Sequence, residues 1–543
     1  MTENRIDAIA LEVLRHALAA VADEMNADLI RTAYSPNINE RRDCSSAVFD
    51  CAGEMVAQAE SIPVHLGAMP YSVAAAIEAA GTFAPGDIVV VNDPYAGGAH
   101  LPDITFVAPV FFQGDLLAFV ASRAHHADVG GKEPGSLAGD SVDIFQEGLR
   151  IPPVRLWRSG ELVDDLLRVI LANVRTPRER LGDLRAQAAG CRMGVARMEE
   201  LFDRYGRDMM ADGMREVLAY SERRMRAEIA RFPRGAVRFE DVLDGDGVAQ
   251  GEIPIRVAIE PKGDRLLVDF TGSAPQAAGP VNAVRAVTAS ATYFAIRAAT
   301  DPTIPANSGC YRPIDIVAPA GTVVNAVAPA AVVGGNLETA QRIVDVILGA
   351  LGKALPRADI GACQGSMNNV AIGGTDPRTG QPYTLYETIG GGFGGRSSAD
   401  GMDGVHSHMT NTLNTPIEAL ETAYPLQVVR YELSPGTGGA GEYRGGLGIR
   451  REIRAIGHTA RVSLLTDRRE RGPYGVRGGG PGAVGRNVRI LADGREEPLP
   501  SKGSALIAAG EALRIETPGG GGWGDPSRRS PDLVERDRRE GRV

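Results

Sequence analysis

The chain has 543 residues, and its 68 acidic and 58 basic side chains give a formal net charge of −10. A chain of this length exceeds what one hydrophobic core usually supports, so we expect two or more packed parts. Hydrophobic residues make up 43% and charged residues 23%, which is typical of a folded globular protein and excludes general disorder. The acidic excess argues against a protein that holds a phosphate backbone, so we expect no nucleic acid partner.

The sequence carries no pattern that directs a chain to a membrane. Its N-terminus lacks the basic and apolar regions of a secretory signal, and no stretch is both long and uncharged enough to cross a bilayer. The cysteines are odd in number and form no CxxC pair, which favours reduced thiols. The sequence therefore predicts a cytoplasmic protein without a membrane partner.

The first half of the chain changes from helix to strand and back to helix patterns. Apolar residues at three- and four-residue spacing predict a long amphipathic helix over 6–31. From 87 to 126, apolar runs predict buried strands, two of which are joined by a Gln-Gly-Asp turn. The segment 162–231 is dense in Leu, Ala, Arg and Glu with few breakers, so we expect helices there.

The second half is richer in strands and glycine. Asn336, which follows two glycines, is predicted to cap the N-terminus of a helix. We expect an α+β (mixed α/β), multi-domain fold with an N-terminal helix and buried sheet, a helical middle segment and a β-rich, Gly-rich C-terminal part. The expected parts are 1–160 (α/β, with the histidine site), 161–235 (helical), 236–330 (β-rich), 331–438 (α/β), 439–526 (β-rich) and a flexible tail at 527–543.

Histidines cluster in one short part of the chain. His100, His125 and His126 lie within 27 positions, and Asp103 follows His100 in the sequence HLPD. The predicted hairpin would return the two later histidines to the neighbourhood of this loop, and imidazole with carboxylate suits zinc, manganese or iron. Because neighbours in a strand point to opposite faces, we expect only one of His125 and His126 to bind. Histidines that are hydrogen-bonded without a metal remain the alternative.

Three further histidines are candidates for contacts with substrate. His406 and His408 are separated by one residue, which would place both on the same face of a strand. A polar loop with two satisfied histidines is an equally good interpretation of that pair. His65, in the sequence SIPVHLGAMP, is isolated and could line the same pocket as the metal site.

Other motifs give weaker predictions. Two GxGxxG matches, at 390–395 and 519–524, are not followed by a helix, and the chain has no GxxxxGK[ST] sequence. Close approach of backbones explains such glycines better than phosphate binding. Cys44 stands beside Arg42, which could activate its thiol, although a buried inert cysteine is the commoner case.

Several blocks of the sequence together resemble one family. They are RTAYSPNINERRDCSSAVFD, GDIVVVNDPYAGGAHLPDI, SRAHHADVGG, GGNLETAQRIVDVILGAL, GGGFGGRSSADGMDGVHSHMTNT and PGGGGWGDP. In this order they are similar to the hydantoinase B/oxoprolinase family, the B-type subunits of ATP-dependent hydantoinases. The resemblance extends over nearly the whole chain.

The resemblance implies a function, a cofactor and a partner. Members work with an A-type, actin-like ATPase subunit, which binds ATP and magnesium and activates a small cyclic-amide substrate by phosphorylation. It also implies a divalent metal on His100, Asp103 and one of His125 and His126. Asp43 and Asp128 are then candidates for a general base or for orienting the ligands.

Two other functions remain open at this point. The chain could be a subunit of an ATP-dependent ketone carboxylase, related to acetone and acetophenone carboxylases. It could also be a non-catalytic scaffold that holds an ATPase partner and whose histidines are structural. Hydrolysis of a lactam or hydantoin ring is the expected reaction.

Overall fold

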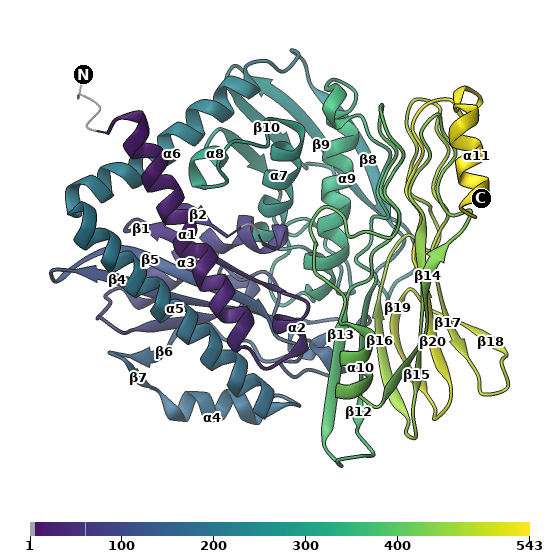
Figure 1. Cartoon of the computed structure of the whole chain (residues 1–543), viewed down its shortest axis with the longest axis horizontal. Helices are drawn as coiled ribbons and strands as arrows, with labels where there is room; N and C mark the ends of the chain where they lie inside the picture. The colour runs from purple at the N-terminus through teal and green to yellow at the C-terminus, as the bar shows by residue number, and fades with distance from the viewer. Residues whose placement is uncertain (1–5, 60) are drawn as a thin grey trace.

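The computed structural model of the protein describes residues 6–59 and 61–543. Figure 1 shows helices α1 (Ala8–Thr32), α5 (Pro177–Tyr205) and α6 (Arg207–Ile229) at one side of the molecule and the C-terminal strands at the other. Helix α1 is the amphipathic helix that the apolar spacing predicts, and the Asp7 side chain caps it by accepting a hydrogen bond from the backbone of Ala10. The fold is the expected mixture of helices and several sheets.

In the part of the chain that the structure describes, the strands form four sheets. The first sheet has the order β2 (Met55–Gln58), β1 (Cys44–Asp50), β5 (Asp115–His125), β4 (Asp103–Phe112), β3 (Ile88–Val91), β6 (Val154–Arg158) and β7 (Glu161–Leu162). The second has the order β11 (Ile314–Val317), β10 (Arg265–Asp269), β9 (Ile253–Lys262) and β8 (Val237–Leu243).

The other two sheets belong to the C-terminal part. One has the order β13 (Pro382–Glu387), β12 (Asn369–Thr375), β16 (Ala460–Leu465) and β19 (Lys502–Ile507). The other has the order β14 (Leu426–Ser434), β15 (Gly448–Ala455), β20 (Ala512–Glu516), β17 (Arg486–Ile490) and β18 (Glu496–Leu499).

Helices cover both faces of the first sheet. Helices α1 and α5 pack against one face, and α3 (Pro63–Ala80) packs against the other and contacts α7 (Arg285–Ala299), which in turn contacts α9 (Ala340–Leu351). The remaining α-helices are α2 (Pro36–Asn39), α4 (Asp164–Ala172), α8 (Ser308–Tyr311), α10 (Ile417–Ala423) and α11 (Pro531–Arg539). Among the described residues, no helix combines the length and the apolar composition that a bilayer-spanning segment requires.

The hairpin of β4 and β5 is the element that positions the site. Its two-residue loop has Gln113 at φ 53° and Gly114 at φ 91°, so both residues take the left-handed conformation of a tight hairpin turn. The turn pairs Phe112 with Asp115, and a β-bulge between Val110 and Phe111 then shifts the register by one residue, so that Asp103 lies directly opposite His125. The hairpin prediction is confirmed, and the turn and the bulge together set the register.

Glycine runs in the C-terminal part pack backbone against backbone. A Cβ atom on Gly392 would lie 2.1 Å from the carbonyl oxygen of Gly446 and 2.1 Å from the amide nitrogen of Gly520. The amide of Gly392 donates to the carbonyl of Pro518 over 3.0 Å. The glycines of both GxGxxG matches thus allow close packing, as the sequence interpretation favoured.

The C-terminal segment differs from the predicted flexible tail. Helix α11 carries Asp537, whose side chain is buried and accepts hydrogen bonds from Arg444 over 3.3 Å and Arg529 over 2.6 Å. The same two arginines bind Asp403 and Asp400. The segment has few apolar side chains, but ion pairs attach it to the rest of the C-terminal part.

Candidate metal centre

Three of the predicted ligands meet at the end of the β4–β5 hairpin. The Nε2 atom of His100 lies 3.0 Å from Oδ1 of Asp103, and Nδ1 of His125 lies 3.2 Å from the same oxygen. The two imidazole nitrogens are themselves 3.2 Å apart. All three side chains are buried, and their ligand atoms lie within 4.8 Å of one another.

This spacing fits a single divalent ion. Donor atoms about 2.1 Å from one ion lie about 3.0–3.4 Å apart in octahedral or tetrahedral geometry. The distances of 3.0, 3.2 and 3.2 Å between His100, Asp103 and His125 fall in that range. The two facing imidazole nitrogens could share one N–H···N hydrogen bond, and when both are unprotonated both can instead donate a lone pair to a cation.

His65 and Asp43 lie at the edge of this group. His65, from the first turn of α3, places Nε2 3.3 Å from Oδ1 of Asp103 and 3.8 Å from Oδ1 of Asp43. The other nitrogen of the His65 ring lies 3.3 Å from the hydroxyl of Ser45. The structure thus brings one predicted substrate contact and one predicted carboxylate base next to the three candidate ligands.

Burial and the neighbouring imidazoles shift the pKa of Asp103 in opposite directions. Burial alone raises the pKa of Asp103, but the adjacent His100 and His65 and the hydrogen bonds to its carboxylate hold that pKa well below its usual range. Burial lowers the pKa of His125, which favours the neutral imidazole that binds a metal. The donor set therefore includes an ionised carboxylate at Asp103 and a neutral imidazole at His125.

Tyr386 and Asn336 orient these ligands, and the sequence interpretation missed both. The Tyr386 ring stacks on His125 with 4.5 Å between centroids and 15° between planes, and its hydroxyl donates to Asn369 over 2.9 Å. Asn336 donates from Nδ2 to Oδ2 of Asp103 over 3.3 Å. Among the described residues, the outer ring nitrogens of His100 and His125 have no hydrogen-bond partner, so ring stacking replaces the usual acceptor for His125.

The N-cap prediction for Asn336 is wrong. Residues Gly335–Thr339 form a π-helical turn that precedes α9, and Asn336 lies inside this turn with a buried side chain. Single π-turns are frequent at functional sites because the wider turn redirects a side chain. The two glycines before Asn336 were the one local signal of an unusual segment. They could not reveal the contact of Asn336 with Asp103, because these two residues are 233 positions apart in the sequence.

His126 points to the opposite face of the hairpin. Its Nε2 atom lies 2.8 Å from the side-chain oxygen of Gln187 on α5, and burial followed by the charge of Arg180 lowers its pKa to about 4. Alternation along the strand predicts this separation. Of the two neighbouring histidines, His125 is the one that joins the cluster.

Asp128 has a different environment from the one expected of a base. Its two oxygens accept hydrogen bonds from the backbone amides of Gly130, Gly135 and Arg175, and the Arg175 side chain pairs with it at 2.8 Å. A carboxylate with this many donors is occupied in holding a loop. The geometry therefore supports Asp43, and not Asp128, as the carboxylate beside the site.

The second histidine pair is not on a strand. His408 has φ 54°, a left-handed conformation that a strand does not contain, so the predicted shared strand face is wrong. His408 lies 3.4 Å from Asp345, and although burial opposes the charged form, Cys363 and Asp345 raise its pKa to about 10. Burial and the charge of Arg41 lower the pKa of His406 to about 3.

Cys44 is an inert buried thiol in this structure. Its side chain is fully buried beside Asn26, and burial followed by the charge of Asp43 raises its pKa above the ordinary value. A thiol that resists ionisation is a poor nucleophile. The alternative of thiolate catalysis at Cys44 therefore finds no support.

A family model for hydantoinase B/oxoprolinase matches residues 7–526. The chain belongs to the hydantoinase B/oxoprolinase family. Among its relatives in this family is a 5-oxoprolinase of Dictyostelium discoideum, 36% identical over 526 residues, which cover 96% of this chain and 40% of that protein. The chain thus spans about two fifths of that 5-oxoprolinase.

Other relatives match from end to end. A candidate B-type subunit of a D-/L-hydantoinase from Pseudomonas sp. strain NS671 is 34% identical over 557 residues, which cover 99% of this chain and 93% of that one. The crystal structure of the ATP-dependent caprolactamase from Pseudomonas jessenii has a TM-score of 0.90 and 32% identity, and covers 99% of this chain and 95% of that chain.

Acetone carboxylase shares the fold of this hydantoinase B/oxoprolinase chain. Its nucleotide-free structure has a TM-score of 0.91 at 20% identity, and the match covers 99% of this chain and 78% of that one. At this identity the likeness concerns the fold alone.

Proposed function

We propose that this chain is the B-type subunit of an ATP-dependent cyclic-amide hydrolase and opens a lactam or hydantoin ring that a partner subunit has activated. The observation that carries the proposal is the buried His100, Asp103 and His125 group, with His65 and Asp43 at its edge. Family membership and the likeness to caprolactamase support the same reaction class.

The proposal assigns a role to each side chain. A divalent zinc, manganese or iron ion would be held by His100, Asp103 and His125. When bound, it would supply Lewis acidity that lowers the pKa of water toward neutrality. Asp43 accepts a proton from the attacking water, and His65, whose Nε2 lies between the carboxylates of Asp43 and Asp103, orients the Asp43 carboxylate. Burial of the group excludes bulk water from the reacting carbon.

The partner supplies the activation step. An amide is a poor electrophile because of resonance, and phosphorylation of its oxygen makes the ring carbon open to water. After water adds, the carbon–nitrogen bond breaks as the nitrogen takes up a proton, and a second water hydrolyses the resulting acyl phosphate to carboxylate and phosphate. We assign this step, with ATP and magnesium, to an A-type actin-like ATPase subunit. The match to a candidate B-type hydantoinase subunit supports a divided arrangement.

Reconstitution tests this proposal. We expect the isolated chain to show no ATP binding by calorimetry and no opening of 5-oxoproline, hydantoin or caprolactam. Both activities are expected when an A-type subunit is added with ATP, and a His100→Ala chain in the same mixture is expected to leave the ring closed. Ring opening by the isolated chain would contradict the division of labour.

Ketone carboxylation is the second candidate, because the resemblance of the sequence leaves it open. The two reactions differ in their need for bicarbonate. ATP turnover that requires both a ketone and bicarbonate would replace the hydrolase proposal. A scaffold role would instead be supported by a purified chain that contains no metal and gives no turnover with any partner.

A further inference from the structure

A cavity lies on the opposite side of helix α3 from the metal group. Its volume is about 340 Å³, and α3 contributes Pro63, Leu66 and Gly67 to its lining. An adjoining cavity of about 390 Å³ continues along the same helix through Pro70 and beyond. These positions recur every three or four residues and so share one face of the helix, whereas His65 projects from the opposite face.

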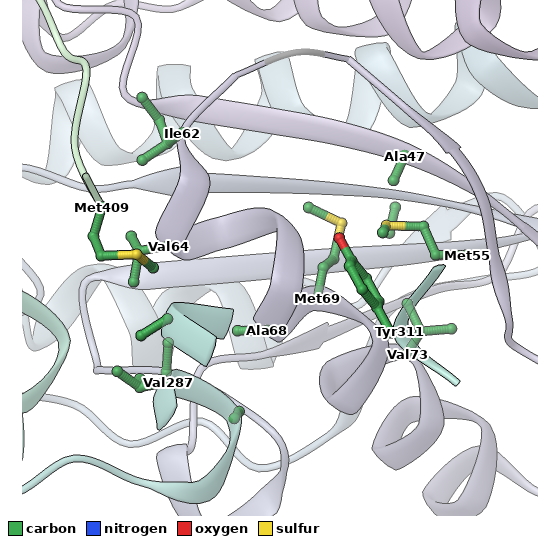
Figure 2. Close-up of a cluster of buried hydrophobic side chains, with 14 of the residues drawn as sticks. Ala47, Met55, Ile62, Val64, Ala68, Met69, Val73, Val287, Tyr311 and Met409 are labelled. Atoms are coloured by element: carbon green, nitrogen blue, oxygen red, sulfur yellow. The ribbon is translucent and has the colours of Figure 1, made fainter. Parts of the chain in front are cut away.

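The walls of the first cavity are rigid elements. The rings of Tyr293 on α7 and Tyr311 on α8 stack with 4.1 Å between centroids and 8° between planes. Figure 2 shows the Tyr311 ring set among Met55, Met69 and Val73, which anchor it in the core.

Helices α3 and α7 approach each other closely beside this cavity. A Cβ atom on Gly67 of α3 would lie 2.6 Å from the Cα of Ser290 on α7. The hydroxyl of Ser290 donates to the carbonyls of Pro63 and Val64 over 3.0 and 3.1 Å. The cavity is therefore formed before any ligand binds.

The polar groups in the lining favour an anion. No acidic side chain lines the cavity among the described residues. Arg297 donates from Nη2 to the carbonyl of Ile304 over 2.9 Å but forms no ion pair within the described chain, and its Nε is buried without a partner. Gln58, across the same lining, has a buried Oε1 that also lacks a partner.

The adjoining cavity offers a direct contrast. Arg312 lines it, but this guanidinium pairs with Glu54 at 2.5 Å and Glu222 at 3.0 Å. Its charge is therefore neutralised by protein carboxylates. Only Arg297 presents an uncompensated positive charge to either described cavity.

We propose that the Arg297 cavity binds a small organic carboxylate that also carries an N–H group. Arg297 would pair with the carboxylate, Gln58 would accept the N–H, and the aromatic and apolar walls would enclose the carbon body. The volume lies at the small end of ligand pockets, which suits a compact molecule of this kind.

The chemistry of ring opening identifies the source of such a molecule. Addition of water to a cyclic amide breaks the carbon–nitrogen bond and yields one carboxylate and one amine on the same chain. This assignment to the ring-opened product rests on the proposed function, whereas carboxylate binding itself does not. The cavity would hold the product on the opposite side of α3 from His65 and the metal group.

Calorimetry of the full chain without ATP or a partner tests the proposal. The probes are 6-aminohexanoate and glutamate, which are the ring-opened forms of caprolactam and 5-oxoproline, and uncharged caprolactam. We expect saturable binding of at least one carboxylate and weaker binding of caprolactam. Arg297→Gln should weaken carboxylate binding at least about tenfold, because it removes a charge-assisted hydrogen bond.

Two further variants separate a binding defect from a folding defect. Gln58→Glu keeps the size of the side chain and adds a negative charge, so it should also weaken carboxylate binding. Arg312→Gln makes the same chemical change as Arg297→Gln in the adjoining cavity and should alter binding by less than about twofold. Retained thermal unfolding of each variant shows that it is folded.

Three outcomes would overturn the proposal. They are no binding of either carboxylate, equal binding by wild type and a folded Arg297→Gln chain, and caprolactam binding as tight as that of 6-aminohexanoate. Because the measurement needs neither ATP nor a partner, its result is separate from the reconstitution assay. Carboxylate binding without ring opening would leave this inference standing and the hydrolase proposal contradicted.

Discussion

Asp103 links every part of the metal group. Its Oδ1 atom lies 3.0–3.3 Å from nitrogens of His100, His125 and His65, and its Oδ2 atom accepts from Asn336. Burial alone would favour a neutral carboxyl, yet the surrounding imidazoles keep the pKa of Asp103 low. One ionised carboxylate at the centre of buried imidazoles is the arrangement that a cation stabilises.

The first prediction concerns His100. His100→Ala removes one of three candidate ligands, so we expect metal affinity to fall by more than about 100-fold and ring opening with the partner to be lost. Metal content by elemental analysis and circular dichroism of the purified chain are the measurements. His126→Gln is the matched control, because His126 is equally buried but contacts Gln187, and it should keep its metal.

A His100→Ala protein with full metal content would show that the ion, if any, is bound elsewhere. Loss of metal from His126→Gln to the same extent would mean that general disruption of the buried hairpin, and not ligand loss, explains the effect.

Single carboxylates also join separate elements in this fold. Glu147 follows the 3₁₀ turn Ile144–Gln146, and its Oε1 accepts hydrogen bonds from the amides of Val332 and Val333 over 2.9 and 3.0 Å. These residues lead into the π-turn that carries Asn336. Glu147 therefore attaches the loop of the first sheet to the element that orients Asp103.

The second prediction is a pH dependence at Glu147. Burial raises its pKa to about 8, against partial opposition from the hydrogen bonds of Val333 and Val332. The folded-state pKa lies above the ordinary value of 4.5, so the folded chain binds the proton more tightly, and stability falls as the pH rises from about 4.5 through about 8. The slope is at most about 1.4 kcal/mol per pH unit.

Glu147→Gln isolates this effect. The amide keeps an acceptor for Val332 and Val333 and removes the titrating group. We expect the free energy of unfolding of the variant to exceed that of the wild type at pH 8.5 by more than it does at pH 5.5, measured by urea denaturation. A difference that does not change between these two pH values would contradict the assignment.

At the scale of the whole molecule, buried charges join parts that are distant in sequence. Arg342 on α9 pairs with Asp241 on β8 at 3.0 Å and with Asp467, after β16, at 2.7 Å. Arg468 pairs with Asp241 at 2.6 Å and with Asp345 at 3.0 Å. One hydrophobic cluster extends from Ile6 to Leu465, and a second cluster, from Val370 to Ile515, holds most of the buried apolar side chains of the C-terminal strands.

The third prediction follows from this network. Arg342→Met removes one of the two cations that pair with each of the buried carboxylates Asp241 and Asp467, so we expect a loss of about 3–5 kcal/mol in the free energy of unfolding, measured by chemical denaturation. The control is Arg168→Met, because Arg168 forms an exposed pair with Asp164 and its loss should cost less than about 1 kcal/mol. A loss at Arg342 no larger than that at Arg168 would mean that the network adds nothing to stability.

Local sequence patterns determined much of this protein. The amphipathic spacing of α1, the tight turn of the β4–β5 hairpin and the alternation of His125 and His126 are short-range features, and each is set by steric and periodic rules of the backbone. The grouping of His100, Asp103 and His125 could be predicted because these three residues lie within 26 positions, at the two ends of one hairpin. Motif blocks along the chain indicated the family.

Only the tertiary structure decided which other groups join the site. Asn336 and Tyr386 reach Asp103 and His125 from segments more than 200 residues away, and no periodicity in the sequence encodes such a contact. The sequence alone does not distinguish Asp128 from Asp43. In the structure, three backbone amides and Arg175 occupy the carboxylate of Asp128, whereas the carboxylate of Asp43 faces His65. The physical reason is that hydrogen-bond partners of a carboxylate are set by packing between distant elements, whereas strands and turns are set by neighbours along the chain.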